Sequence, residues 1–141
     1  MQWRKWLRSS QPDHAPARLL ATNITRRNTL ATHVEVADSG AARSRGLLGR
    51  KGLAHGEALW IVPCEAVHTF GMQFSLDLVY LDREYRIKKI RQDVPPWRFS
   101  VCLTAHSVLE LPAGALQGLQ VSVGDIIAFS PAVQKPAERP S

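Results

Sequence analysis

The apolar residues of this chain come in short runs that end at a proline or a polar turn. Residues 58–62 (ALWIV) form a continuous apolar run that stops at Pro63, and residues 107–111 (SVLEL) stop at Pro112. Residues 30–37 (LATHVEVA) alternate with the period of two that is typical of a half-buried strand. Runs of this length predict short strands. None approaches the roughly 20 apolar residues of a membrane span, so we expect no transmembrane segment.

The rest of the pattern adds strands and little helix. Further strands are predicted over residues 74–81, 86–91, 121–125 and 126–129. One short helix is predicted from a cap at Asp38 or Ser39 to Leu48, ended by Gly49, and a second over residues 113–119. Strands do not alternate with long helices, which argues against a doubly wound parallel sheet. We therefore predict a mostly β fold, a compact single domain that is barrel-like or sandwich-like, with two short helices.

The length and the distribution of charge set the expected domain boundaries. The 141 residues suit one domain, and the net charge is +6. Residues 28–130 carry ten basic and ten acidic side chains, so the excess lies at the ends. We expect a basic flexible segment over residues 1–27, a globular β-rich domain over 28–130, and a disordered Pro-rich tail over 131–141. A neutral domain lacks the charge pattern of a specific nucleic-acid-binding protein.

The start of the chain suggests a location. Trp3, Trp6 and Leu7 lie on one side of a possible basic helical turn, which supports at most weak contact with a membrane surface. Polar residues follow where a secretory signal would have its apolar stretch, so we expect a cytoplasmic protein. In that compartment Cys64 and Cys102 are expected to be reduced thiols.

Two carboxylates interrupt otherwise apolar strands. Asp77 and Glu110 each need a partner if they are buried, because an unpaired buried charge is costly. They serve either as an acid/base pair or as acceptors of hydrogen bonds that hold the fold. Arg45 and Arg91 are the arginines best placed to pair with these carboxylates. For Asp77 we expect a donor from an arginine, Arg45 first, or from loop backbone N–H groups.

His68 follows Cys64 by four residues, a spacing that suggests either a nucleophile with its base or two metal ligands. In an extended segment, however, the two side chains would lie about 13 Å apart, too far to share an ion. The remaining histidines and Cys102 are scattered. We therefore expect no metal and no cofactor. The alternative is a buried thiol and a histidine bonded to backbone.

Five short motifs occur in a fixed order. They are residues 45–50 (RGLLGR), 68–72 (HTFGM), 76–82 (LDLVYLD), 110–114 (ELPAG) and 123–125 (VGD). Together they resemble domain-of-unknown-function family 192, which consists of small prokaryotic proteins; Leu48 stands where the family often has methionine. The resemblance spans roughly residues 28–130 and implies a compact, mostly β domain. It implies no established activity, substrate or cofactor. Some members carry export signals, and we expect none here.

Three functions remain open. The first is a binding or accessory domain in which Arg45, His68, Asp77 and Glu110 surround a small pocket for a polar ligand or a protein segment. The second is a structural or partner-interaction module. The third is a small hydrolase or isomerase with Asp77 or Glu110 as acid/base and Arg45 as an anion clamp. We rank them in this order because no nucleophile can be identified, and whether the protein is an enzyme stays open.

Overall fold

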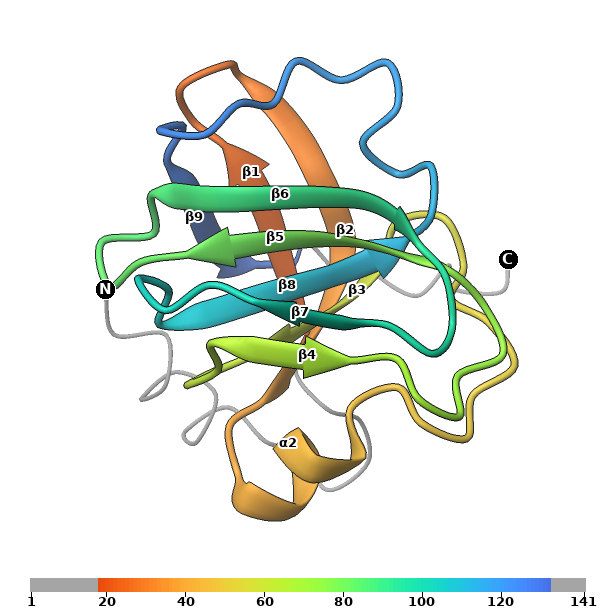
Figure 1. Ribbon diagram of the computed structural model, residues 1–141. Helices are drawn as coiled ribbons and strands as arrows, with labels where there is room; N and C mark the ends of the chain where they lie inside the picture. Colours follow the sequence, from red (N-terminus) through yellow and green to blue (C-terminus); the bar gives the residue numbers. More distant parts are fainter. Residues whose placement is uncertain (1–17, 133–141) are drawn as a thin grey trace, which may run out of the picture.

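The computed structural model describes residues 18–132, which form a curled seven-stranded sheet, a two-stranded ribbon and one short helix (Figure 1). The sheet contains β1 (Leu19–Asn23), β2 (Asn28–Ala37), β3 (Glu57–Ile61), β5 (Leu76–Leu81), β6 (Ile87–Val94), β8 (Ser107–Pro112) and β9 (Ile127–Pro131). Its strand order is β6-β5-β8-β3-β2-β1-β9, and every neighbouring pair is antiparallel except β2 and β3. The ribbon pairs β4 (Ala66–His68) with β7 (Phe99–Val101), and the helix is α2 (Gly40–Arg45).

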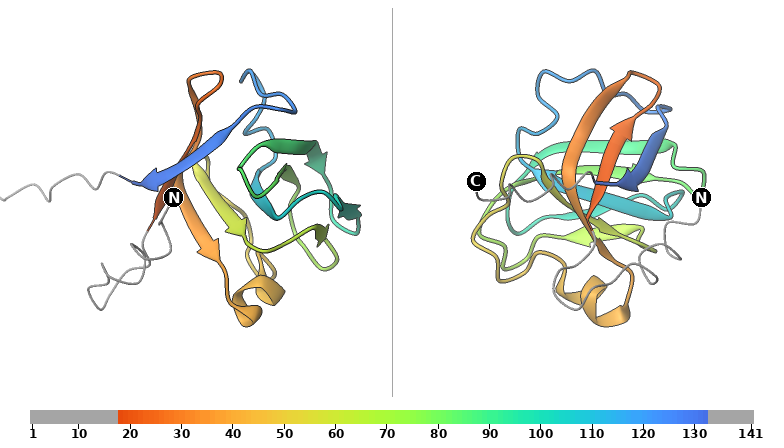
Figure 2. Two further views of the ribbon diagram at one scale, coloured as in Figure 1. Left: turned by 90° about the vertical axis from the view of Figure 1, so that its left-hand side faces the viewer. Right: turned by 180° about the vertical axis from the view of Figure 1, so that it is seen from behind.

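The two edge strands of the sheet approach each other at their first residues. The Ile87 N–H donates to the Asp125 carbonyl at 2.8 Å, and the Ile127 N–H donates to the Tyr85 carbonyl at 2.9 Å. These bonds curl the sheet into a partly closed barrel, as the side view shows (Figure 2). Partial closure protects part of both edges from pairing with other chains. The fold is therefore mostly β and barrel-like, as the sequence predicts.

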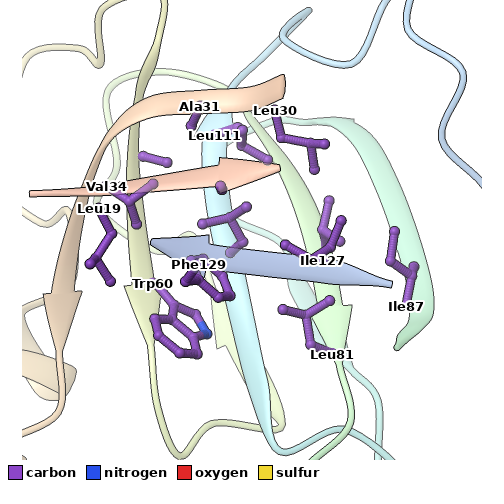
Figure 3. Packing of buried hydrophobic residues seen from close by; sticks show 14 of the residues in the cluster. Leu19, Leu30, Ala31, Val34, Trp60, Leu81, Ile87, Leu111, Ile127 and Phe129 are labelled. Atoms are coloured by element: carbon purple, nitrogen blue, oxygen red, sulfur yellow. The ribbon is translucent and has the colours of Figure 1, made fainter. Parts of the chain in front are cut away.

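The interior of the curl holds the first of two apolar cores, which we call the barrel core (Figure 3). The rings of Trp60 on β3 and Phe129 on β9 stack with centroids 3.8 Å apart. The buried members of the barrel core are Leu19, Ala21, Leu30, Ala31, Val34, Ala58, Trp60, Val62, Val79, Leu81, Ile87, Leu109, Leu111, Leu116, Ile127 and Phe129.

The opposite face of β3, β5 and β8 carries a second core, the outer core, which lies under the ribbon and the turn after α2. Its buried members are Ala37, Leu47, Leu59, Ile61, Val67, Leu76, Leu78, Tyr80, Val94, Cys102 and Val108. The Tyr80 hydroxyl donates to Ser100 Oγ at 2.9 Å and so ties the ribbon to β5. Because successive side chains of a strand point to opposite faces, β5 is buried throughout and contributes to both cores.

The helix is shorter than the sequence pattern suggests. Ser39 caps it, since its side-chain oxygen accepts the Ala42 N–H at 3.1 Å. The helix ends at Arg45 because Gly46, with φ of 49°, leaves the helical conformation three residues before the expected Gly49. The second expected helix, over residues 113–119, is a series of hydrogen-bonded turns, and residues 121–125 form a turn where a strand was predicted. The described residues thus contain one helix where two were expected.

The sheet also includes residues before 28, the expected start of the globular domain. Leu19 to Asn23 form β1 inside the same sheet, and the Ala132 N–H donates to the Arg18 carbonyl at 3.1 Å. Residues 1–17 and 133–141, where most of the expected N-terminal segment and tail fall, lie outside the described residues. Cys64 and Cys102 are both free thiols, as expected. The one helix in the described part of the chain has six residues, too few to cross a membrane.

Candidate functional site

A small pocket opens between the C-terminal end of α2 and the outer edge of β4. Its volume is about 90 Å³. It is lined by Arg43, Ser44, Arg45, Gly46, Leu47, Leu48, Ile61, Cys64, Ala66, Val67, His68, Phe70, Met72, Leu76 and Glu110. Three of the four residues selected from the sequence, Arg45, His68 and Glu110, therefore meet at one cavity, and Asp77 is absent from it.

Glu110 forms the polar floor of this pocket. It lies in the middle of β8, is only 4% exposed, and shares the outer-core side of the sheet with its cross-strand partner Leu78. None of the residues 18–132 donates a hydrogen bond to its carboxyl group. Burial raises the pKa of Glu110 to about 7, and the charge of Arg50 offsets this only in part.

Arg50 does not donate to Glu110 and pairs with Glu35 instead. Its guanidinium donates to Glu35 Oε2 at 2.6 Å, and Arg18 pairs with the other oxygen of the same carboxylate. Burial alone would raise the pKa of Glu35, but these two arginines lower it below its ordinary value. The positive charge of Arg50, which lies near Glu110, is therefore paired with Glu35.

The rim of the pocket is cationic and aromatic. Arg45, at the last position of α2, and His68, at the end of β4, are both exposed there. The His68 ring stacks on Phe70 with centroids 5.2 Å apart. Leu48 closes one side against Gly71, where an added Cβ would lie 3.2 Å from the Leu48 methyl carbon; with φ of 79°, Gly71 also has a backbone conformation that favours glycine.

Cys64 contributes a thiol that is in its protonated form at neutral pH. Its Sγ donates to the Ala66 carbonyl at 3.1 Å. Burial raises the pKa of the Cys64 thiol, and the nearby charge of Glu110 adds to this effect. A nucleophilic cysteine needs the opposite environment, one that favours the thiolate. The spacing of Cys64 and His68 thus reflects two walls of one pocket.

Asp77 has a structural role on the other side of the sheet. It is fully buried, and its two oxygens accept the backbone N–H groups of Asp93 at 2.8 Å and Leu116 at 3.1 Å. Of the two kinds of donor expected for Asp77, loop backbone is present through Leu116, the second N–H comes from Asp93 in β6, and Arg45 is not a partner. Asp77 is opposite Leu111 in the register, so it points into the barrel side while Glu110 points outward. The two carboxylates cannot form one acid/base pair.

Arg43 and Cys64 also belong to the pocket, although the four residues selected as its ligand-binding set do not include them. Both line the pocket because α2 ends and β4 begins beside it, an arrangement without a local sequence signal. Within residues 18–132, no three side chains of His, Cys, Asp or Glu cluster in a way that could hold a metal ion. The polar groups of the pocket suit an organic group that can donate to a carboxyl and accept from an arginine.

Comparison with known proteins gives a consistent family assignment. The family described as "Uncharacterized ACR" (DUF192) matches residues 22–129. A UPF0127 protein of Pyrococcus abyssi is 35% identical over 103 residues, covering 68% of this chain and 85% of the relative. A UPF0127 protein of Pyrococcus furiosus is 28% identical over 114 residues, covering 77% of this chain and 96% of the relative.

Two solved structures share the fold. A protein of unknown function from Novosphingobium aromaticivorans has a TM-score of 0.69 and 19% identity, covering 85% of this chain and 94% of its own. A Sinorhizobium meliloti protein described as a "putative transcription regulator" has a TM-score of 0.71 and 22% identity, covering 85% of this chain and 98% of its own. Identities this low concern the fold alone.

Proposed function

We propose that this chain is a binding protein, whose pocket takes a small polar group that donates a hydrogen bond to Glu110. The chain belongs to the DUF192 family. The observation that carries the proposal is the Glu110 carboxyl, which is buried and lacks a donor among the described residues. A ligand that donates a hydrogen bond inside the pocket would supply the partner that the described residues do not.

The rim supports a second requirement for the ligand. Arg45 and His68 are exposed at the pocket opening and can contact an anionic group. A ligand with an ammonium, hydroxyl or amide donor at one end and a carboxylate close by would satisfy both the floor and the rim.

The size of the cavity limits what enters it. A volume of about 90 Å³ holds roughly three water molecules, far below the several hundred Å³ of pockets for drug-sized ligands. The occupant is therefore a small molecule, or one end of a larger molecule or protein segment.

Catalysis is the second candidate, and one observation favours it. A carboxyl with a pKa of about 7 is suited to proton transfer near neutral pH. The protonated Cys64 thiol and the remote Asp77 leave this carboxyl without a nucleophile or a second acid beside it. Binding is therefore the better supported role.

The test uses glycine as a probe, since it carries an ammonium and a carboxylate within a small volume. Glycine, acetate and methylammonium are titrated into the ¹⁵N-labelled full chain at pH 8, and backbone shifts near Glu110 and His68 are followed. We expect glycine to produce saturable shifts there at lower concentration than either single-charge probe. Glu110→Gln should weaken the response, and the exposed control Glu84→Gln should not. Equal responses to all three probes, or a response unchanged in Glu110→Gln, would refute the proposal.

A further inference from the structure

The outer face of the ribbon exposes a continuous set of large apolar side chains. Alternation along β7 buries Ser100 and turns Phe99 and Val101 outward. In the turn that follows, Cys102 is buried and Leu103 is 77% exposed. Five of the eight large apolar side chains exposed in the described residues belong to this region. We call it the ribbon face; it consists of His68, Phe70, Trp97, Phe99, Val101 and Leu103. An apolar patch of this kind on a small domain marks an interaction surface.

The aromatic part of the ribbon face is held in a fixed geometry. Trp97 is 68% exposed and has φ of 65°, a conformation that is uncommon for a bulky residue. Buried Thr69 holds this loop, because its carbonyl accepts the Trp97 N–H at 3.1 Å and its hydroxyl donates to the Pro95 carbonyl at 2.7 Å. Trp97 stacks on Phe70, which stacks on His68. Side chains fixed before binding lose little entropy when a partner docks.

The charged side chains that reach β7 are basic. Lys89 Nζ donates to the Val101 carbonyl at 2.8 Å, Arg91 donates to the Phe99 carbonyl at 3.5 Å, and Arg98 donates to the Trp97 carbonyl at 3.3 Å. These cations border Trp97, Phe99 and Val101 and favour an acidic partner there. Leu103 lies instead beside Glu65, Asp82 and Glu84. A second copy of the chain would bring the same three cations against their own kind.

The ribbon face is also continuous with a free strand edge. Two backbone hydrogen bonds join the residues that flank β4 to those that flank β7. The Cys102 N–H donates to the Glu65 carbonyl at 2.8 Å, and the Thr69 N–H donates to the Arg98 carbonyl at 2.9 Å. In an antiparallel pair the intervening residues direct their backbone groups to the other edge, so His68 offers its N–H and carbonyl there. A peptide backbone can pair with such groups.

We propose that the ribbon face docks an extended, acidic segment of another protein, whose apolar side chains cover Trp97, Phe99 and Val101 while its carboxylates face Lys89, Arg91 and Arg98. The ribbon lies on the side of the molecule away from β1 and β9, so the segment would approach without contacting the barrel closure (Figure 2). His68 and Phe70 also line the Glu110 pocket, whereas Trp97, Phe99 and Val101 do not.

A capped synthetic peptide in which glutamate alternates with phenylalanine and leucine is the probe. It is titrated into the ¹⁵N-labelled full chain, with a matched peptide carrying lysine for glutamate as the control. We expect only the acidic peptide to shift the signals of β4 and β7, with an affinity that falls as salt is added. Trp97→Ala should weaken binding about thirtyfold, as for a hot-spot aromatic. Val123→Ala, which removes a similarly exposed apolar side chain outside the ribbon face, should leave it unchanged.

Glu110→Gln should also leave the peptide affinity unchanged, which separates this proposal from the role of the pocket. Three further probes are the alternatives: a short oligothymidylate, vesicles of phosphatidylglycerol and phosphatidylcholine, and the chain itself in sedimentation. Tighter binding of the oligonucleotide or the vesicles through Trp97, or dimerisation that Phe99→Ala abolishes, would overturn the proposal. Failure of the acidic peptide to bind at the ribbon face would overturn it as well.

Discussion

At the scale of single residues, Asp77 and Glu110 are two buried carboxyl groups with opposite surroundings. Asp77 has a backbone N–H for each oxygen, whereas Glu110 has no donor among the described residues and faces a cavity. Both lie within apolar strands, so composition does not distinguish them. The register does, because Asp77 is opposite Leu111 and Glu110 is opposite Leu78, on the other face of the same strand pair.

Asp77→Ala should strongly destabilise the protein. The substitution leaves the N–H groups of Asp93 and Leu116 without their acceptor, and each unsatisfied buried group costs about 1–3 kcal/mol. We expect a loss of about 3 kcal/mol in the free energy of unfolding by urea, with Asp77→Asn intermediate because the amide keeps one acceptor. The control is Glu84→Ala, an exposed turn position expected to change stability by less than about 0.5 kcal/mol. Equal effects of Asp77→Ala and Glu84→Ala would contradict the structural role.

Glu110→Gln should stabilise the protein, and the gain should grow with pH. The folded-state pKa of about 7 lies above the ordinary 4.5, so between these values the folded protein binds more protons than the unfolded chain. The stability of the parent therefore falls as the pH rises through this window, while glutamine does not titrate. The stability difference between variant and parent should be about 2 to 3 kcal/mol larger at pH 8 than at pH 5. Urea unfolding at both values measures it, and a difference independent of pH would argue against a raised pKa.

At the scale of elements, Asp125 joins the hairpin of β1 and β2 to the turn before β9. Its Oδ2 accepts from the Asn23 amide and from the Ser122 N–H, each at 2.9 Å, and Arg26 donates to the same carboxylate. Burial alone would raise the pKa of Asp125, but the hydrogen bonds from Asn23, Ser122 and Arg26 lower it. The carboxylate thus links segments about a hundred residues apart.

Asp125→Asn should lower the melting temperature by several degrees at neutral pH, because the amide cannot accept all of these donors. A depressed folded-state pKa gives stability that is present above the ordinary value of 3.8 and is lost as the pH falls through the folded pKa. The gap between parent and variant should therefore narrow in acid. Asp38→Asn, at an exposed position, is the control. Melting curves from pH 7 down to pH 3 measure the difference in melting temperature between parent and variant. A difference that stays constant would contradict the lowered pKa of Asp125.

The sequence pattern predicts most strands because each carries its own signal. Alternation marks β2, and the apolar run before Pro63 marks β3. The ribbon strands were missed because each has only three residues, and the outward residues of β7 are apolar, which hides the alternation. Arg45, His68 and Glu110 could be selected as polar residues in informative places. Their meeting at one pocket, and the exclusion of Asp77, depend on strand register and on the position of α2, which no local pattern encodes.

At the scale of the whole molecule, the two faces of the sheet carry different tasks. The barrel side closes the fold around Trp60 and Phe129, and the outer side carries the pocket and the ribbon face. The outer side also holds the outer core, but the exposed side chains that we assign to peptide binding, such as Phe99, lie outside both cores.

Two phenylalanines test this separation. Phe129→Ala removes a buried ring of the barrel core and should cost about 3–5 kcal/mol of unfolding free energy. Phe99→Ala removes a ring that is 60% exposed and should cost less than about 0.5 kcal/mol. Denaturant unfolding of both variants measures the contrast. Comparable losses would mean that the ribbon face is part of the core that holds the protein together.

Glu110 is a buried carboxyl without a hydrogen-bond donor among the described residues, and its own titration tests this most directly. The ¹³C shift of the Glu110 side-chain carboxyl, assigned by its loss in Glu110→Gln, can be followed from pH 4 to pH 9 in the full chain. The structure predicts a midpoint near 7, where burial without a partner places it. A midpoint near the ordinary value of 4.5 would mean that the carboxyl is solvated or already paired, and would contradict the account.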